Sequence, residues 1–104
     1  MQVNPVHKSL DEAEKQEFDD YLEKKIPRIE KLLTHFAQDA VLLTAVIEKF
    51  EKHSAFKVEF KLEIPSSMLV AGESSHAITK AIDLTIDRLV AQLKKHLEKL
   101  NNKV

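Results

Sequence analysis

Apolar side chains occupy every second position from 56 to 64, and lysine or glutamate occupies each position between them. Because successive side chains of a strand point to opposite faces, this period of two predicts a half-buried β-strand. A β-rich run at 40–52 precedes it across a polar break at 51–55 that suits a hairpin, and residues 68–72 form a third run after Pro65-Ser66-Ser67. The pattern therefore predicts three consecutive antiparallel strands.

A long amphipathic helix is predicted before these strands. Ser9 followed by Glu12 is a capping-box pattern, which places the helix start near Leu10. Spacings of three and four residues predict one apolar face that ends near His35 or Phe36. That face consists of Phe18, Leu22, Ile26, Ile29, Leu33 and Phe36.

Two prolines interrupt the regular patterns. Pro27 lies inside the first helix, where it removes a hydrogen bond and predicts a kink or break between Glu23 and Pro27. Pro5 lies in the run from Gln2 to Val6, which we therefore expect to form no more than a short edge strand.

A second amphipathic helix is predicted in the last third of the chain, with Ser74 or Ser75 as its cap. The element order strand, helix, three strands, helix predicts an α+β fold, β-α-β-β-β-α. Two helices would cover one face of a mainly antiparallel sheet. The predicted core stripe of the last helix is Ile78, Ile82, Ile86, Leu89, Leu93, Leu97 and Leu100.

Length and composition predict a single domain over residues 1–104. The chain is 43% hydrophobic and 32% charged, which is typical of a folded globular protein. No apolar run approaches the roughly 20 residues that span a bilayer, and the start lacks a signal-peptide pattern, so we expect a cytoplasmic protein. The absence of cysteine excludes disulfides, thiolate metal sites and cysteine nucleophiles.

The net charge of −1 conceals a separation of charge along the sequence. Residues 10–23 carry seven acids and one lysine, whereas residues 24–31 carry four cations and one glutamate. Residues 88–104 again hold an excess of cations. The sign of the charge therefore changes within the first helix, and the last helix ends in a basic segment.

Cations also fall on helical stripes. At about 100° per residue, Lys24, Arg28, Lys31 and His35 share one side of the first helix. Arg88, Lys95 and Lys99 share one side of the last helix. If the helices lie side by side, a groove between both stripes would attract phosphates. The alternative is a solvated helix surface whose cations stabilise the helix C-termini.

Other chemistry has little support in the sequence. The five histidines share no i, i+4 pair, and Gly72 is the only glycine, so no metal site and no phosphate loop are predicted. Lys57 and Lys61 alternate with glutamates and suggest a cross-strand charge ladder. We predict no catalytic residue, cofactor, small-molecule substrate or membrane partner.

The last helix resembles that of the ribosome hibernation-promoting factor family, also called ribosome-associated inhibitor or factor Y. The first helix and the strand order agree more loosely. The resemblance implies a fold like that of double-stranded-RNA-binding domains, bound in the decoding channel of the small ribosomal subunit, where it silences translation in starved or stationary cells. The matching residues are Ala81-Ile82-Asp83, Ile86-Asp87-Arg88-Leu89, Gln92-Leu93, Lys95-His96 and Lys99-Leu100.

The resemblance also implies RNA-binding positions and partners. The family's basic positions correspond here to Lys25, Arg28, Arg88, Lys95 and Lys99. The partners implied are small-subunit rRNA and, in addition, ribosomal proteins. Helical geometry alone adds Lys24, Lys31, Lys80 and Lys94.

The sequence departs from the family pattern at three positions of the last helix and in the first helix. Ala91 and Leu97 replace further cations, and Thr79 replaces an aromatic residue. The chain looks like the short form, without a C-terminal dimerisation domain. Because the first helix is more acidic than in relatives, a second hypothesis is a protein-interaction module that pairs through a sheet edge or through this acidic helix.

Overall fold

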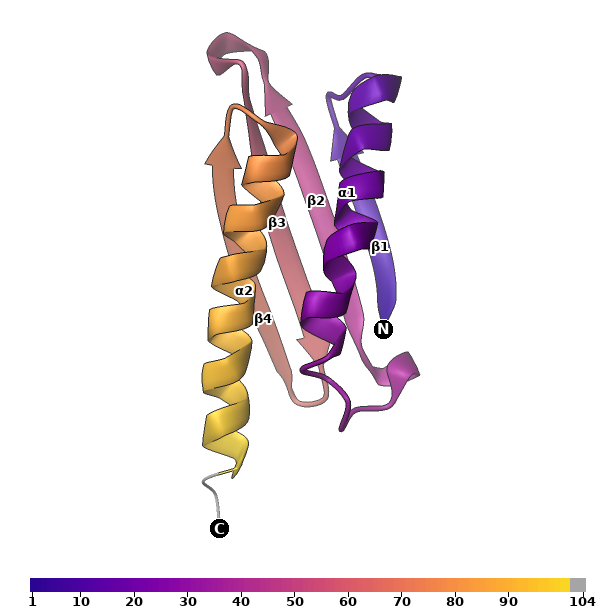
Figure 1. Ribbon diagram of the computed structural model, residues 1–104, viewed down its shortest axis with the longest axis vertical. Helices are drawn as coiled ribbons and strands as arrows, with labels where there is room; N and C mark the ends of the chain where they lie inside the picture. Colours follow the sequence, from indigo (N-terminus) through magenta and orange to yellow (C-terminus); the bar gives the residue numbers. More distant parts are fainter. Residues whose placement is uncertain (102–104) are drawn as a thin grey trace.

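A four-stranded sheet carries two helices on one face in the computed structural model, which describes residues 1–101 (Figure 1). The predicted α+β class, the order β-α-β-β-β-α and the placement of both helices on one face are confirmed. The elements are β1 (Gln2–Lys8), α1 (Glu12–Glu30), β2 (Leu42–Phe50), β3 (Ala55–Ile64), β4 (Ser67–Ser75) and α2 (Ile78–Asn101).

The strand order in the sheet is β1-β2-β3-β4. As predicted, β2, β3 and β4 are antiparallel, while β1 pairs parallel to β2 because α1 crosses over between them. The Gln2 N–H donates to the Val41 carbonyl at 2.9 Å, so even-numbered residues of β1 bond to β2. The backbone nitrogen of Pro5, which carries no hydrogen, therefore faces the open edge of the sheet, where no bond to β2 is lost. This explains how a proline fits in this strand.

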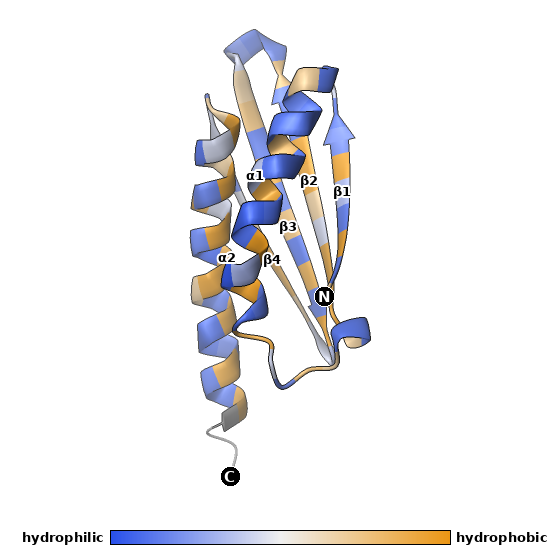
Figure 2. Ribbon diagram, turned by 45° about the vertical axis from the view of Figure 1, so that its right-hand side comes forward, coloured by the Kyte–Doolittle hydropathy of each residue, from blue (hydrophilic) through white to orange (hydrophobic). Residues whose placement is uncertain are grey.

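The core lies between the sheet and the helices. The alternation in β3 is confirmed, because its even-numbered residues are buried and point to the helices. Phe60 is fully buried and pairs with Ala45 on one side and Ala71 on the other. One large ring thus fills space that two small neighbours leave open. Hydrophilic residues cover the outer side of α1 (Figure 2).

The start of α1 differs from the prediction. Asp11 is the N-cap, its carboxylate accepts from the Glu14 N–H at 2.8 Å, and the Glu14 carboxylate accepts from the Asp11 N–H at 3.0 Å. Ser9 instead has a left-handed backbone, with φ of 64°. Two capping-box spacings overlap in the sequence, and the prediction chose the first of them.

The end of α1 also differs from the prediction. The helix continues through Pro27 without a break and ends at Glu30, not at His35 or Phe36. Beyond that point Leu32 and Leu33 donate to carbonyls three residues back, at 3.0 and 2.9 Å. These tighter turns still direct Leu33 into the core. A spacing of three residues fits such turns as well as a helix, so it misled the prediction.

The predicted serine cap and the last core position of α2 are wrong. β4 extends to Ser75, because that residue pairs with Phe56, and α2 begins three residues later. The Ala77 N–H does donate to the Ser75 hydroxyl, at 3.4 Å. Leu100 is 46% exposed. A 24-residue helix is about 36 Å long and outruns a strand of nine residues, so its last turns overhang the sheet (Figure 1).

No helix among residues 1–101 covers the other face of the sheet (Figure 1). The register places Lys8, Glu48 and Lys57 in one row across three strands, with alternating charge. Thr44 and Val70 flank Lys61, so the predicted ladder is limited to that row. None of these side chains forms an ion pair within 4.0 Å in the described part of the chain.

An ion pair joins the first turn of α1 to β2. Lys49 Nζ lies 2.8 Å from Glu14 Oε2. This hydrogen bond, followed by the one from the Asp11 N–H, holds the pKa of Glu14 below its ordinary value of 4.5. The same bond to Glu14 raises the pKa of Lys49. The pair anchors α1 directly at its capping box.

This pair predicts a pH dependence of stability. Because the folded-state pKa of Glu14 is lowered, its contribution is present above about pH 4.5 and is lost as the pH falls through the folded-state pKa. Between about pH 5 and pH 3, we expect the free energy of unfolding to decrease less in Lys49→Met than in the wild type. Urea unfolding at several pH values measures this. The control is Lys57→Met on the open sheet face, and parallel curves for Lys49→Met and wild type would contradict the expectation.

Candidate nucleic-acid interface

Tyr21, Lys25 and Arg28 lie on one side of α1, because their spacings of four and three residues follow the helical repeat. They meet two carboxylates of α2. The Tyr21 hydroxyl donates to both oxygens of Asp83 at 2.9 Å, and Lys25 Nζ lies 3.5 Å from Asp83. Arg28 donates to Asp87 at 2.9 Å. We call these five residues the seam; they fasten α1 to α2.

Lys25 is held on several sides within the seam. Its ammonium lies 5.0 Å from the centre of the Tyr21 ring. The Tyr21 side chain and then the Asp83 carboxylate raise the pKa of Lys25. Lys25 therefore stays charged at neutral pH, but its charge is already matched by a carboxylate. An RNA phosphate would have to compete with Asp83 for it.

Arg88 points to the opposite side of α2 from the seam. Its guanidinium pairs with Glu73 of β4, and Gln92, one turn further along, donates to the Val70 carbonyl at 3.0 Å. The stripe of Arg88, Lys95 and Lys99 therefore follows the β4 edge, whereas Arg28 faces α2. The expected single groove between both cationic stripes is wrong, because carboxylates of α2 occupy that position.

Six of the nine predicted cations are exposed and form no ion pair among residues 1–101. Three of them, Lys94, Lys95 and Lys99, lie on the last turns of α2, and Lys31 is the C-cap of α1. Lys31 lines one hollow with Leu97 and Leu100, so the two helix ends adjoin. We call these four lysines the basic end. The remaining two exposed cations are Lys24 and Lys80.

The structure thus divides the predicted RNA-binding residues into two groups. Lys25, Arg28 and Arg88 are paired with carboxylates, and the six lysines have no carboxylate partner within residues 1–101. His35 lies in the turn beyond α1, so it does not share a helical stripe with Arg28. Whether each residue binds RNA stays a prediction.

Sequence reasoning missed the carboxylates that pair with the cations. Glu73, Asp83 and Asp87 lie far along the chain from most of their partners, so no local pattern connects them. A signal did exist, since Asp83 and Asp87 are four residues apart and their partners Lys25 and Arg28 are three apart, and both spacings keep side chains on one face of a helix. Two complementary stripes of this kind indicate helices that pack side by side.

Residues 1–101 contain no cluster of three or more histidines and carboxylates that could hold a metal ion. None of the helices there is long and apolar enough to cross a membrane.

Relatives of known designation match most of the chain. A ribosome hibernation promoting factor from Pseudomonas putida is 41% identical over 80 residues, which cover 77% of this chain and 72% of the relative. A protein of the same designation from Azotobacter vinelandii is 34% identical over 99 residues, which cover 95% of this chain and 85% of that protein. These matches confirm the resemblance inferred from the last helix.

Solved structures share the fold. The N-terminal domain of Thermus thermophilus Protein Y superposes with a TM-score of 0.68 at 21% identity, covering 92% of this chain and 99% of that domain. A ribosomal subunit interface protein from Coxiella burnetii gives 0.63 at 18% identity, covering 94% and 99%. The family model described as Sigma 54 modulation protein / S30EA ribosomal protein matches residues 8–101. The chain therefore belongs to the Sigma 54 modulation protein / S30EA ribosomal protein family.

Proposed function

We propose that this protein is a ribosome hibernation factor. It binds the small ribosomal subunit in the decoding channel, where mRNA and tRNA anticodon stems lie, and inhibits translation under stress or in stationary phase. Residues 1–104 act as a single ribosome-binding domain in the cytoplasm. The observation that carries this proposal is family membership over residues 8–101, together with relatives designated ribosome hibernation promoting factor.

The mechanism is occupancy and not catalysis. Lysines of the basic end contact rRNA phosphates, which positions the domain by the shape of the RNA and not by base sequence. Lys24 and Lys80 add contacts along the helices, and ribosomal proteins contribute further surfaces. Lys25, Arg28 and Arg88 take part where a phosphate replaces their carboxylate partner. No cofactor or small-molecule substrate enters this mechanism.

Binding by phosphate contacts predicts a steep salt dependence. Four lysine contacts give a slope of log K against log salt of about −2.8 to −3.6, which is roughly a 50- to 150-fold loss of affinity between 50 and 200 mM KCl. Co-sedimentation of the purified protein with small subunits, at constant Mg²⁺, measures this slope. A slope near zero, or no co-sedimentation at low salt, would contradict the proposal.

A further inference from the structure

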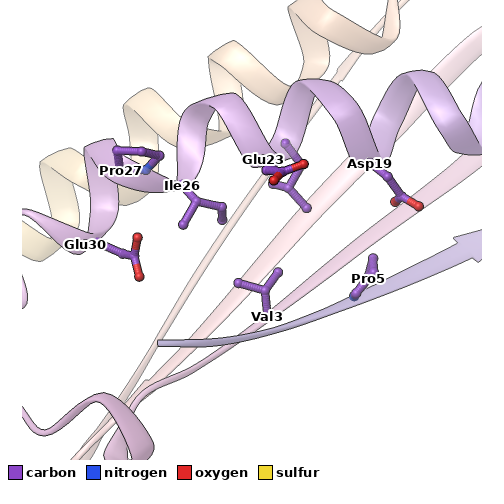
Figure 3. Close-up of a pocket in the computed structure, with 8 residues that line it drawn as sticks. Val3, Pro5, Asp19, Glu23, Ile26, Pro27 and Glu30 are labelled. Carbon is purple, nitrogen blue, oxygen red and sulfur yellow. The ribbon is translucent and has the colours of Figure 1, made fainter.

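A groove separates α1 from the edge strand β1, on the flank of α1 opposite the seam (Figure 3). Its volume is about 330 Å³. Val3 and Pro5 point into it from β1, and Ile26 and Pro27 line it from α1. Val3 is 38% exposed although it lies on the helix-facing side of the sheet, so this apolar surface is open to solvent.

Three carboxylates of α1 line the same groove: Asp19, Glu23 and Glu30 (Figure 3). Asp19 accepts a hydrogen bond from His7 at 2.8 Å, and Glu30 lies 3.7 Å from the Met1 amino nitrogen. Glu23 is exposed and has no ion-pair partner in the described part of the chain. The groove therefore combines an apolar floor with a negative rim.

The apolar floor and the negative rim together determine which kind of ligand the groove can bind. Carboxylates repel the phosphates of RNA and attract lysine or arginine, while the apolar floor favours aliphatic side chains. The volume is at the lower end of the range of about 300–1,000 Å³ for ligand pockets, so it suits a few side chains. Pro5 removes a donor from the open edge, so recognition must rely on side chains more than on strand addition.

We propose that the α1–β1 groove is a docking site for a basic, extended segment of a partner protein. The segment inserts aliphatic side chains between Val3 and Ile26 and places a lysine or arginine beside Glu23. This site goes beyond the proposed rRNA contacts, and it shares no residue with the basic end. One domain can therefore hold RNA at one surface and a cationic protein segment at another.

The test uses a fluorescein-labelled ten-residue peptide in which lysine and leucine alternate, with binding followed by fluorescence anisotropy. We expect Glu23→Gln and Val3→Ser each to weaken binding about fivefold or more, since each removes one half of the recognition. Glu17→Gln removes the same charge from another side of α1 and is expected to change affinity less than about twofold. Circular dichroism confirms that the variants fold.

Two further peptides separate the contributions of charge and apolar surface. A peptide with serine in place of leucine, and one with glutamate in place of lysine, should each bind about tenfold more weakly or worse. Amide chemical shifts should move at Val3 and along residues 19–30. Equal loss of affinity in Glu17→Gln, or equal binding of the serine peptide, would overturn the docking site.

The alternative occupant of the groove is a second copy of this chain. Shifts at the same residues on raising protein concentration without peptide would identify it and overturn the proposal. Small-subunit sedimentation is measured on the same variants. Since Glu23→Gln leaves the basic end intact, a failure of the docking site is distinguishable from a failure of rRNA binding.

Discussion

Replacing Lys94, Lys95 and Lys99 together with glutamate is expected to abolish co-sedimentation with small ribosomal subunits. Each lysine–phosphate contact contributes about 1 kcal/mol in a water-like environment, so losing three costs about 3 kcal/mol, and reversing the sign adds repulsion. The affinity should therefore fall at least about 100-fold at 100 mM salt. Because all three side chains are exposed and lack ion pairs within residues 1–101, the fold should survive.

The matched control changes the same total charge on the open sheet face. Lys8, Lys57 and Lys61 are exposed, lie on β1 and β3, and are also free of ion pairs among the described residues. Their triple replacement with glutamate should reduce binding far less than the α2 variant. If both variants lose binding equally, the interaction reports only overall charge, and the basic end has no special role.

Replacing Phe60 with alanine is expected to lower the free energy of unfolding by about 3–5 kcal/mol. The ring is fully buried, and its strand neighbours Ala45 and Ala71 cannot fill the space that it leaves. The total stability of such a domain is about 5–15 kcal/mol, so this one change removes a large share. Urea denaturation followed by circular dichroism measures the difference.

Two further variants serve as controls for Phe60→Ala. Phe60→Leu keeps most of the volume and should cost much less than alanine. Val70→Ala removes an apolar group from the 43%-exposed side chain on the open sheet face, where a loss below about 1 kcal/mol is expected. A small effect of Phe60→Ala would mean that the helices close over the gap, contrary to the packing described above.

Local sequence pattern predicted an element correctly wherever it fitted only one kind of secondary structure. Strict alternation in β3 admits only a strand, and its prediction is confirmed. The segment from Ile29 to Phe36 was ambiguous, since a spacing of three or four residues suits a helix and also successive tight turns. The parallel pairing of β1 depends on contacts some 40 residues apart, which short-range pattern does not contain.

The sequence predicted less of the candidate site than of the fold. Helical geometry correctly placed Lys95 and Lys99 on one side of a helix, but it gave no information on what that side faces. Arg88 faces β4 and Arg28 faces α2 only because the two helices pack in a particular rotation. Rotation about a helix axis is set by tertiary packing, so ion pairs such as Arg28–Asp87 emerge only from the folded structure.

The long, narrow shape of the molecule also determines how its charges act in solution. The principal extent is 50 Å, and the first turns of α1 and the last turns of α2 lie at opposite ends (Figure 1). At physiological ionic strength the Debye length is about 8 Å, so an incoming polyanion at one end does not sense the acids at the other. In very dilute buffer the Debye length rises to about 30 Å, so the acids in the first turns of α1 would begin to repel the polyanion.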